Sequence, residues 1–136
     1  MADCIFCKII EGSIPSYTIF ENDLFKAFLD INPATFGHTL IVPKIHAIDI
    51  FDVPQEYAKE MFLLSQKIAT QIKQSLGCDG INILQNNGSV AGQVVFHYHM
   101  HLIPRYKNDN VRVGWEPLKP TQEEFENTLS NLLMEE

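Results

Sequence analysis

Apolar residues recur along the 136-residue chain with two different periods, and each period predicts a different kind of element. Short apolar runs and alternating segments, bounded by Gly, Pro, Asn and Asp, predict β-strands, because side chains in a strand switch faces at every residue. Apolar positions spaced by three and four predict a helix with one apolar side. The expected strands cover residues 17–20, 24–30, 38–43, 80–85 and 94–104.

Two helices are expected from their apolar stripes and their end signals. The long helix is expected to begin near Pro54, with Asp52 as its N-cap, and to end at Gly77. A C-terminal helix is expected to begin at Thr121, because Glu124 three residues later completes a capping box. The apolar side of the first helix is formed by Tyr57, Met61, Leu64, Ile68 and Ile72, and that of the second by Phe125, Leu129, Leu132 and Leu133.

This order of elements predicts the fold class. Three strands, one long helix, two further strands and a C-terminal helix are typical of an α+β domain with a mainly antiparallel sheet. A chain of 136 residues is long enough for one domain with a real core, and we expect a single domain over residues 1–136.

Residues 97–103 carry the strongest chemical signal, because three of the five histidines alternate there with apolar residues. Alternation predicts that His97, His99 and His101 share one strand face, about 6.6 Å apart from one to the next. Each imidazole offers a donor and an acceptor and has a pKa near neutrality. The row therefore suits metal binding or phosphate chemistry in which an imidazole attacks phosphorus; a solvated strand face is the plain alternative.

Charge and composition narrow the possible partners. A net charge of −7 argues against a nucleic-acid polymer, which needs a basic surface, but permits a small anion in a locally positive cleft. Apolar runs are strand-sized, and the N-terminus lacks the basic and apolar regions of a secretory signal, so we expect no membrane partner and a cytoplasmic protein. Three cysteines do not form a disulfide framework.

Several segments in register resemble the histidine triad (HIT) family of nucleotide-binding proteins. They are His-Tyr-His-Met-His-Leu-Ile at 97–103, Cys-Ile-Phe-Cys-Lys-Ile at 4–9, Ala-Phe-Leu-Asp-Ile at 27–31, Gly-His-Thr-Leu-Ile-Val-Pro-Lys at 37–44 with His46, and Ala-Gly-Gln at 91–93. The likeness covers residues 4–106 and is strongest to bacterial members of the branch that hydrolyses purine nucleoside phosphoramidates. It implies a HIT-like fold with a five-stranded sheet, one long helix and a C-terminal helix, in a homodimer whose two sheets join.

The resemblance also implies a mechanism. His99 would attack the α-phosphorus and form a nucleotidyl-histidine that water hydrolyses, which divides one hard displacement into two easier ones. His101 would contact the phosphate or handle protons, and His38 would support the triad from the neighbouring strand. Hydrogen bonding of the other His99 ring nitrogen to a backbone carbonyl would set its tautomer.

Nucleotide contacts follow from the same resemblance. Asp30 would accept hydrogen bonds from the ribose hydroxyls, and Ile31 and Phe6 would pack against the purine of an AMP-like ligand. Gln93 and the backbone amide of Val94 would donate hydrogen bonds to the phosphate oxygens, and Asn86 would contact the phosphate or the leaving group. Val94 replaces the serine common in phosphoramidase-type members and removes a hydroxyl that can donate to the leaving group.

A zinc site is also implied by the resemblance. Cys4-x-x-Cys7 alone is a weak signal, but bacterial members with these cysteines and the Pro-Lys-x-His segment are similar to zinc binders. The ligand set would be Cys4, Cys7, His46 and His97. Four protein ligands leave no open position, so one zinc per chain would be structural; a pair of reduced cysteines is the alternative.

Other functions stay open at this stage. They are a dinucleoside polyphosphate hydrolase, a nucleotidyl transferase, a hydrolytic zinc enzyme and a nucleotide-binding regulatory protein with little turnover. The tail over 107–136 diverges from the family pattern. Trp115 in it either approaches the partner protomer's cleft or packs in the dimer.

Overall fold

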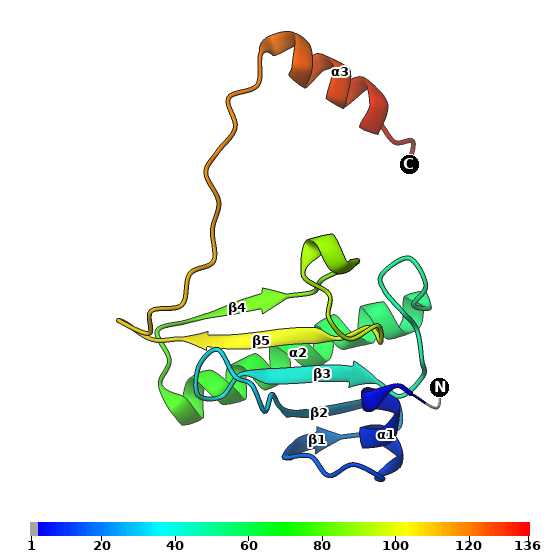
Figure 1. Cartoon of the computed structure of the whole chain (residues 1–136), viewed down its shortest axis with the longest axis vertical. Helices are drawn as coiled ribbons and strands as arrows, with labels where there is room; N and C mark the ends of the chain where they lie inside the picture. The colour runs from blue at the N-terminus through cyan, green and yellow to red at the C-terminus, as the bar shows by residue number, and fades with distance from the viewer. Residues whose placement is uncertain (1–2) are drawn as a thin grey trace.

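A computed structural model describes residues 3–136 as a five-stranded antiparallel sheet with helices on both of its faces (Figure 1). The strands lie in the order β1-β2-β3-β5-β4, so β1 and β4 form the two edges. The elements are α1 (Ile5–Glu11), β1 (Thr18–Glu21), β2 (Phe25–Leu29), β3 (Thr39–Pro43), α2 (Gln55–Leu76), β4 (Gly80–Leu84), the 3₁₀ turn η1 (Ser89–Ala91), β5 (Met100–Arg105) and α3 (Gln122–Leu132). The predicted α+β class and antiparallel five-stranded sheet are confirmed.

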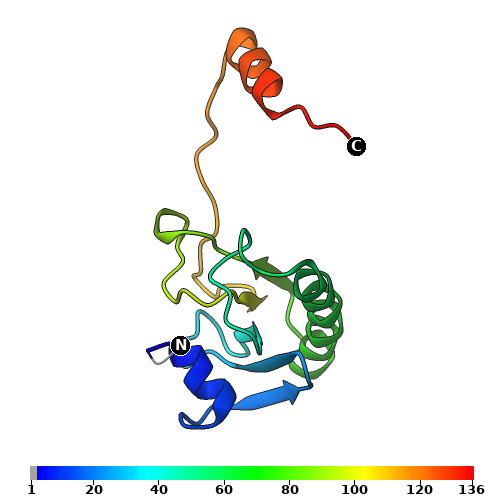
Figure 2. The same ribbon diagram turned by 90° about the vertical axis from the view of Figure 1, so that its right-hand side faces the viewer.

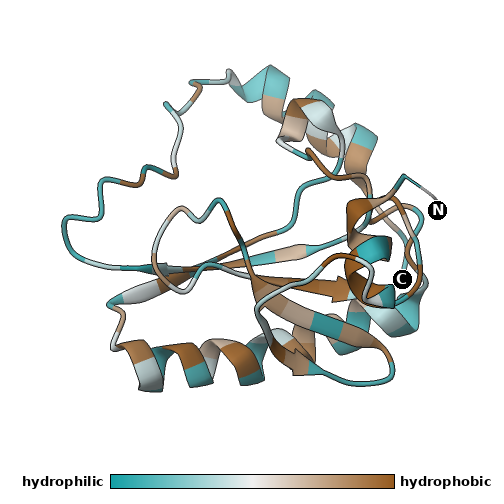
Figure 3. Cartoon of the chain, turned by 60° about the horizontal axis from the view of Figure 1, so that its bottom comes forward, coloured by the Kyte–Doolittle hydropathy of each residue, from teal (hydrophilic) through white to brown (hydrophobic). Residues whose placement is uncertain are grey.

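Helix α2 covers one face of the sheet and closes the main core (Figure 2). Four of the five stripe residues predicted from the sequence are buried, and Tyr57 packs against them from the margin. Alternating bands of apolar and hydrophilic residues along α2 are visible in Figure 3. This stripe is buried against residues of β2, β3 and β5, which leaves the other face of the sheet for the remaining elements.

Helix α1 covers part of the opposite face and was not predicted. Its residues Phe6 and Ile9 join Phe28, Leu40 and Val42 in a second core cluster. The Cys4 sulfur accepts the N–H of Cys7 at 3.4 Å and caps the helix. Gly12 ends the helix in the left-handed region, with φ of 90°.

The long helix begins and ends where predicted, but its cap differs. Pro54 stands at the N-cap and makes no side-chain capping bond. The Asp52 carboxylate instead accepts the N–H of Ile48 at 2.8 Å, so the expectation of Asp52 as N-cap is wrong. Gly77 is left-handed, as a C-terminal glycine should be, and the capping box of Thr121 and Glu124 is present.

The fifth strand is shorter than predicted, because it begins at Met100 rather than at 94. Its ladder with β3 ends at the pair Ile41–Met100. Before Met100 the backbone makes other hydrogen bonds. The Tyr98 N–H donates to the Ala47 carbonyl at 2.7 Å, and the His97 carbonyl accepts a hydrogen bond from the His99 ring. The alternation survives this change: Tyr98 lies in the main core with Met100 and Leu102, while the histidines lie elsewhere.

Residues 107–121, the arm, begin with a turn at 107–108 and continue as a segment without helix or strand that carries α3 away from the sheet (Figures 1 and 2). Every residue of α3 is exposed, including the predicted apolar side. Within residues 3–136 no helix combines the length and apolar character that crossing a bilayer requires.

Candidate active site and metal cluster

His99 is held by its own strand segment in one tautomer. Its Nδ1 lies 2.6 Å from the His97 carbonyl oxygen. A carbonyl oxygen can only accept, so Nδ1 carries the proton and Nε2 keeps a free lone pair in the neutral ring. A free lone pair on an imidazole nitrogen is the feature that a nucleophile needs.

A second pair of imidazoles lies beside it. His38 Nδ1 accepts the Ala34 N–H at 3.0 Å, so the neutral His38 ring carries its proton on Nε2. His38 Nε2 is 2.9 Å from His101 Nδ1 and donates to it. Neutral His101 must then be protonated on Nε2, which makes that atom a hydrogen-bond donor. The backbone of one loop thus determines the proton position two rings away.

Burial keeps these rings neutral. It is the largest cause that lowers the pKa of His99 and of His38 below 6.5. Burial, followed by the charges of His99 and His38, lowers the pKa of His101 to about 4. The Asp30 carboxylate, whose oxygen lies 3.5 Å from His38 Nε2, opposes the shift. Near neutral pH the site therefore contains an unprotonated Nε2 on His99 and a neutral donor on His101.

The three rings border a cleft of about 470 Å³, a size ordinary for a small-molecule ligand. Phe6 from α1 forms one wall, and its ring stands edge-on to the His99 ring with centroids 5.0 Å apart. Ile31 lines the mouth and is 74% exposed, so it offers a bare apolar surface. Asp30 lines the cleft too, and one of its oxygens accepts the Asn32 N–H at 2.8 Å.

The loop before the triad brings two of the three predicted phosphate-binding residues to the cleft, but not the third. Asn86 and Val94 line the cleft, and the Asn86 amide donates to the Gly92 carbonyl at 3.4 Å. The Val94 N–H donates to no acceptor within residues 3–136. Gln93 does not line the cleft: its buried carboxamide accepts the Gly88 N–H and donates to the Ile48 carbonyl. The expected phosphate contact from the Gln93 side chain is therefore not prepared in this structure.

The four predicted metal ligands come together from three separate segments. Sulfur and nitrogen atoms of Cys4, Cys7, His46 and His97 all lie within 4.8 Å of one another. His97 Nδ1 is 3.3 Å from the Cys4 sulfur and 3.6 Å from the Cys7 sulfur, and His46 Nδ1 is 3.4 Å from the Cys7 sulfur. Tetrahedral zinc with ordinary bond lengths separates sulfur and nitrogen ligands by about 3.5 Å. His97 Nε2 donates to the Pro43 carbonyl at 2.9 Å, which leaves Nδ1 as the ligand atom. The residues present fit zinc.

Sequence reasoning missed part of the cleft wall. Ile5 and the segment 14–16 line it in addition to the expected residues. Ile5 and Ile9 are four apart and follow a capping residue, which is a helical signal, but seven residues are too few for the period to stand out. The segment 14–16 has no pattern of its own that marks it as part of a site.

The HIT domain family model matches residues 11–108. "Protein hit" of Bacillus subtilis is 49% identical over 115 residues, covering 84% of this chain and 79% of that protein. The adenosine 5'-monophosphoramidase HNT1 of Saccharomyces cerevisiae is 43% identical, covering 90% of this chain and 73% of the yeast protein. The adenylylsulfatase HINT3 of Arabidopsis thaliana is 42% identical, and the match spans 79% of this chain but 54% of the plant protein.

Solved structures agree with these relatives. A HIT family protein from Bacillus subtilis superposes with a TM-score of 0.89 at 41% identity, covering 98% of this chain and 99% of that one. A zinc-bound histidine triad family protein from Mycobacterium smegmatis superposes with a TM-score of 0.78 at 40% identity, covering 85% and 84%. The fold, the triad and the family model therefore point the same way: the chain belongs to the HIT domain family.

Proposed function

We propose that this protein hydrolyses nucleoside 5′-phosphoramidates or related adenylated compounds through a nucleotidyl intermediate on His99. The observation that carries the proposal is the bond from His99 Nδ1 to the His97 carbonyl, which leaves Nε2 unprotonated at the cleft. Two relatives support the substrate class, since one is named an adenosine 5'-monophosphoramidase and another an adenylylsulfatase.

In the first step His99 Nε2 bonds to the α-phosphorus, and the bond from phosphorus to the leaving nitrogen breaks. The leaving nitrogen takes its electron pair and needs a proton. The Nε2–H of His101 is the neighbouring donor, because His38 occupies the other His101 nitrogen. Water then attacks phosphorus, and the bond from phosphorus to His99 Nε2 breaks and leaves neutral His99. The proton that the water loses returns to His101 Nε2, so the nucleoside monophosphate is released and both rings are restored.

The same cleft accounts for a purine nucleotide as ligand. Phe6 and Ile31 offer apolar surface for the base, and the Asp30 carboxylate offers acceptors for the two ribose hydroxyls. Asn86 and the Val94 N–H are the donors nearest in the loop for phosphate oxygens. We assign no phosphate contact to the Gln93 side chain, which is committed to the loop.

We further propose one structural zinc per chain, held by Cys4, Cys7, His46 and His97. Bound zinc would supply a cross-link between the N-terminal segment and the triad segment, and no catalytic position, because all four ligands come from the protein. A reducing compartment such as the cytoplasm suits this site, since a Cys4–Cys7 disulfide would remove two ligands.

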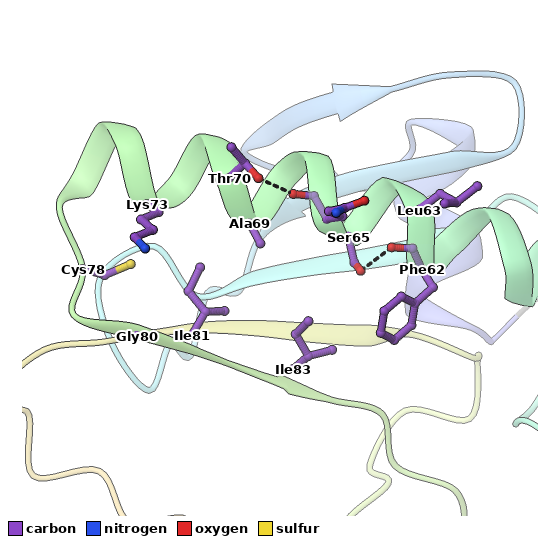
Figure 4. Close-up of a pocket in the computed structure, with 11 residues that line it drawn as sticks. Phe62, Leu63, Ser65, Ala69, Thr70, Lys73, Cys78, Gly80, Ile81 and Ile83 are labelled. Carbon is purple, nitrogen blue, oxygen red and sulfur yellow. Dashed lines mark hydrogen bonds between the residues drawn. The ribbon is translucent and has the colours of Figure 1, made fainter.

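A homodimer joined along β4 is the assembly that we propose. β4 is an edge strand, and an apolar groove runs between it and α2 (Figure 4). Phe62 and Leu63 from α2 and Ile83 from β4 remain 60%, 55% and 41% exposed there. Pairing of two β4 strands would cover this groove and extend the sheet across both copies.

The test is hydrolysis of adenosine 5′-phosphoramidate by the wild type and by His99→Ala. We expect the variant to bind adenosine monophosphate but to lose turnover by at least about a thousandfold, because the covalent route is gone. Intact mass after a rapid acid-free quench should show a transient adenylyl adduct on the wild type only. Similar turnover in both proteins would refute the mechanism, and an inactive, folded wild type would redirect the assay to dinucleoside polyphosphates and then to a binding role.

A further inference from the structure

The loop between β2 and β3, residues 30–38, sets the tautomer of His38 through its own backbone. The Asp30 N–H donates to the His38 carbonyl at 2.9 Å and closes the neck of the loop, and the His38 N–H donates to the Thr35 carbonyl at 3.2 Å. Inside the loop the Ala34 N–H donates to His38 Nδ1 at 3.0 Å. The position of the Ala34 peptide therefore decides which His38 nitrogen carries the proton.

Little apolar packing holds the tip of this loop. Asn32, Pro33 and Ala34 are exposed, and the Phe36 ring is 89% exposed. The start of the loop is held separately, because the Asp30 carboxylate accepts the Asn32 N–H at 2.8 Å. The tip needs hydrogen bonds to another element to keep the Ala34 peptide in place.

The end of β5 supplies those hydrogen bonds and lies beside the loop (Figure 1). Beyond the last pair of the β3–β5 ladder, the Pro104 carbonyl accepts the Thr35 hydroxyl at 2.6 Å. The Tyr106 hydroxyl donates to the Phe36 carbonyl at 2.8 Å. Two consecutive loop residues are therefore tied to the end of the strand that carries His101.

Thr35 is the tie that lies next to the Ala34 peptide. Its partner Pro104 is fully buried, so water is a poor substitute for the hydroxyl at this carbonyl. Backbone N–H donors keep their acceptors at about 2.7–3.2 Å, and the bond to His38 already measures 3.0 Å. A shift of the Ala34 peptide by a few tenths of an ångström therefore weakens this bond.

We propose that Thr35 is a positioning residue for the first step of the proposed hydrolysis, on which this inference rests. Its bond to the Pro104 carbonyl keeps the Ala34 N–H on His38, and His38 in turn keeps the proton of His101 on Nε2. Without the anchor, His38 can carry its proton on Nδ1. His101 then donates from its own Nδ1 to His38, and no His101 donor faces the leaving group.

The first test is the tautomer of His38 and His101 in Thr35→Val, which keeps the shape of the side chain but removes the hydroxyl. Nitrogen NMR of the folded full chain near neutral pH distinguishes protonated from unprotonated ring nitrogens. We expect the His101 proton on Nε2 in the wild type and in Thr35→Ser, which retains a hydroxyl, and a shift of this proton toward Nδ1 in Thr35→Val. This measurement needs no turnover, so its result is separate from that of the proposed hydrolysis.

Leaving groups of different basicity provide the second test. Adenosine 5′-phosphoramidate releases a nitrogen that needs a proton, whereas adenosine 5′-phosphosulfate releases sulfate, which does not. In single turnovers we expect Thr35→Val to slow adenylyl transfer to His99 roughly tenfold with the phosphoramidate and less than about twofold with the phosphosulfate. The affinity for adenosine monophosphate should stay within about twofold, because Thr35 does not line the cleft.

Thr70→Val is the matched control, because the Thr70 hydroxyl also donates to a backbone carbonyl, that of Gln66 at 2.8 Å, but lies on α2. We expect wild-type tautomers and rates in this variant. An unchanged His101 tautomer in folded Thr35→Val would overturn the proposal. Equal slowing with both substrates would also overturn it, because that result indicates only a general loss of loop structure. A wild type that hydrolyses neither compound would refute the proposed hydrolysis, and the NMR comparison would still decide whether Thr35 positions the proton.

Discussion

At the scale of single residues, the proposed chemistry depends on where three ring protons lie. The His97 carbonyl fixes the tautomer of His99. The tautomer of His101 is fixed by its hydrogen bond from His38, and the tautomer of His38 is fixed by the Ala34 N–H. None of these bonds crosses open solvent, and burial keeps the rings neutral. The site is therefore prepared before a substrate enters, with its acceptor and donor already assigned.

His38→Ala tests this proton arrangement. Without the donor on Nε2, His101 can move its proton to Nδ1 and lose the donor at the cleft, so we expect kcat for phosphoramidate hydrolysis to fall roughly tenfold to a hundredfold. KM should change less, because Phe6, Ile31 and Asp30, the residues proposed to contact the base and the ribose, are unchanged. His38→Gln keeps a donor and should recover part of kcat; equal losses in both variants, or an unchanged His101 tautomer by nitrogen NMR, would contradict the arrangement.

Val94→Ser tests the position at which this chain departs from the family pattern. Val94 lines the cleft and is 84% exposed, so a hydroxyl fits there without repacking. A donor near the leaving group should raise kcat by about tenfold and leave the affinity for adenosine monophosphate unchanged. Val90→Ser, at an exposed position that does not line the cleft, is the matched control. Equal kcat in wild type and Val94→Ser would remove the leaving-group role from this position.

At the scale of elements, α1 connects the metal cluster to the cleft. Cys4 and Cys7 stand at the start of the helix, and Phe6 between them contacts both His97 and His99 edge-on, with centroids 5.9 and 5.0 Å apart. A metal ion bound by these cysteines would therefore fix the position of a cleft wall. The helix has only seven residues, so its own hydrogen bonds cannot hold it in place.

Removal of zinc should weaken nucleotide binding as well as stability. We expect the purified protein to contain about one zinc per chain, and chelation to lower the affinity for adenosine monophosphate by about tenfold because α1 and Phe6 lose their anchor. Calorimetry of nucleotide binding and metal analysis measure the two effects separately. Cys4→Ser should reproduce the loss, whereas Cys78→Ala, which alters a buried thiol outside the cluster, should keep both zinc and affinity. Unchanged affinity in zinc-free, folded protein would show that α1 does not need the metal.

At the scale of the whole molecule, the main core and the candidate site lie on opposite faces of the sheet. One face is covered by α2 and carries the main apolar core. The other face carries α1, the buried histidines and the cleft. Neutral imidazoles can be buried there at modest cost, but charged ones cannot. We therefore expect the fold to be sensitive to acid through the histidines of the candidate site.

Stability should fall in mildly acidic solution for this reason. The folded pKa of His101 is about 4, below its ordinary value of 6.5, so the unfolded chain binds more protons between these two values. The contribution of neutral His101 to the free energy of unfolding is therefore fully present above about pH 6.5 and decreases as the pH falls toward about 4. Urea midpoints at about pH 7.5 and about pH 5 should differ in the wild type and differ less in His101→Gln. An equal difference in both proteins would assign the acid sensitivity to other groups.

Local patterns in the sequence were enough for the elements that depend on neighbours along the chain. The stripe of α2, its end at Gly77 and the capping box at Thr121 follow from residues within a turn or two of one another. The alternation that puts Tyr98 in the core and His99 on the other side is equally local. These features hold because helix and strand periods are properties of the backbone itself.

Tertiary structure decided what depends on residues far apart. The triad strand starts late because Tyr98 bonds the Ala47 carbonyl and His97 bonds Pro43, contacts that no local pattern contains. The Gln93 side chain points into its own loop because it provides hydrogen-bond partners there for the Gly88 N–H and for the Ile48 and Val95 carbonyls. Local periodicity thus determined this protein's strands, long helix and candidate histidines, whereas hydrogen bonds between distant segments decided which ring nitrogens are free.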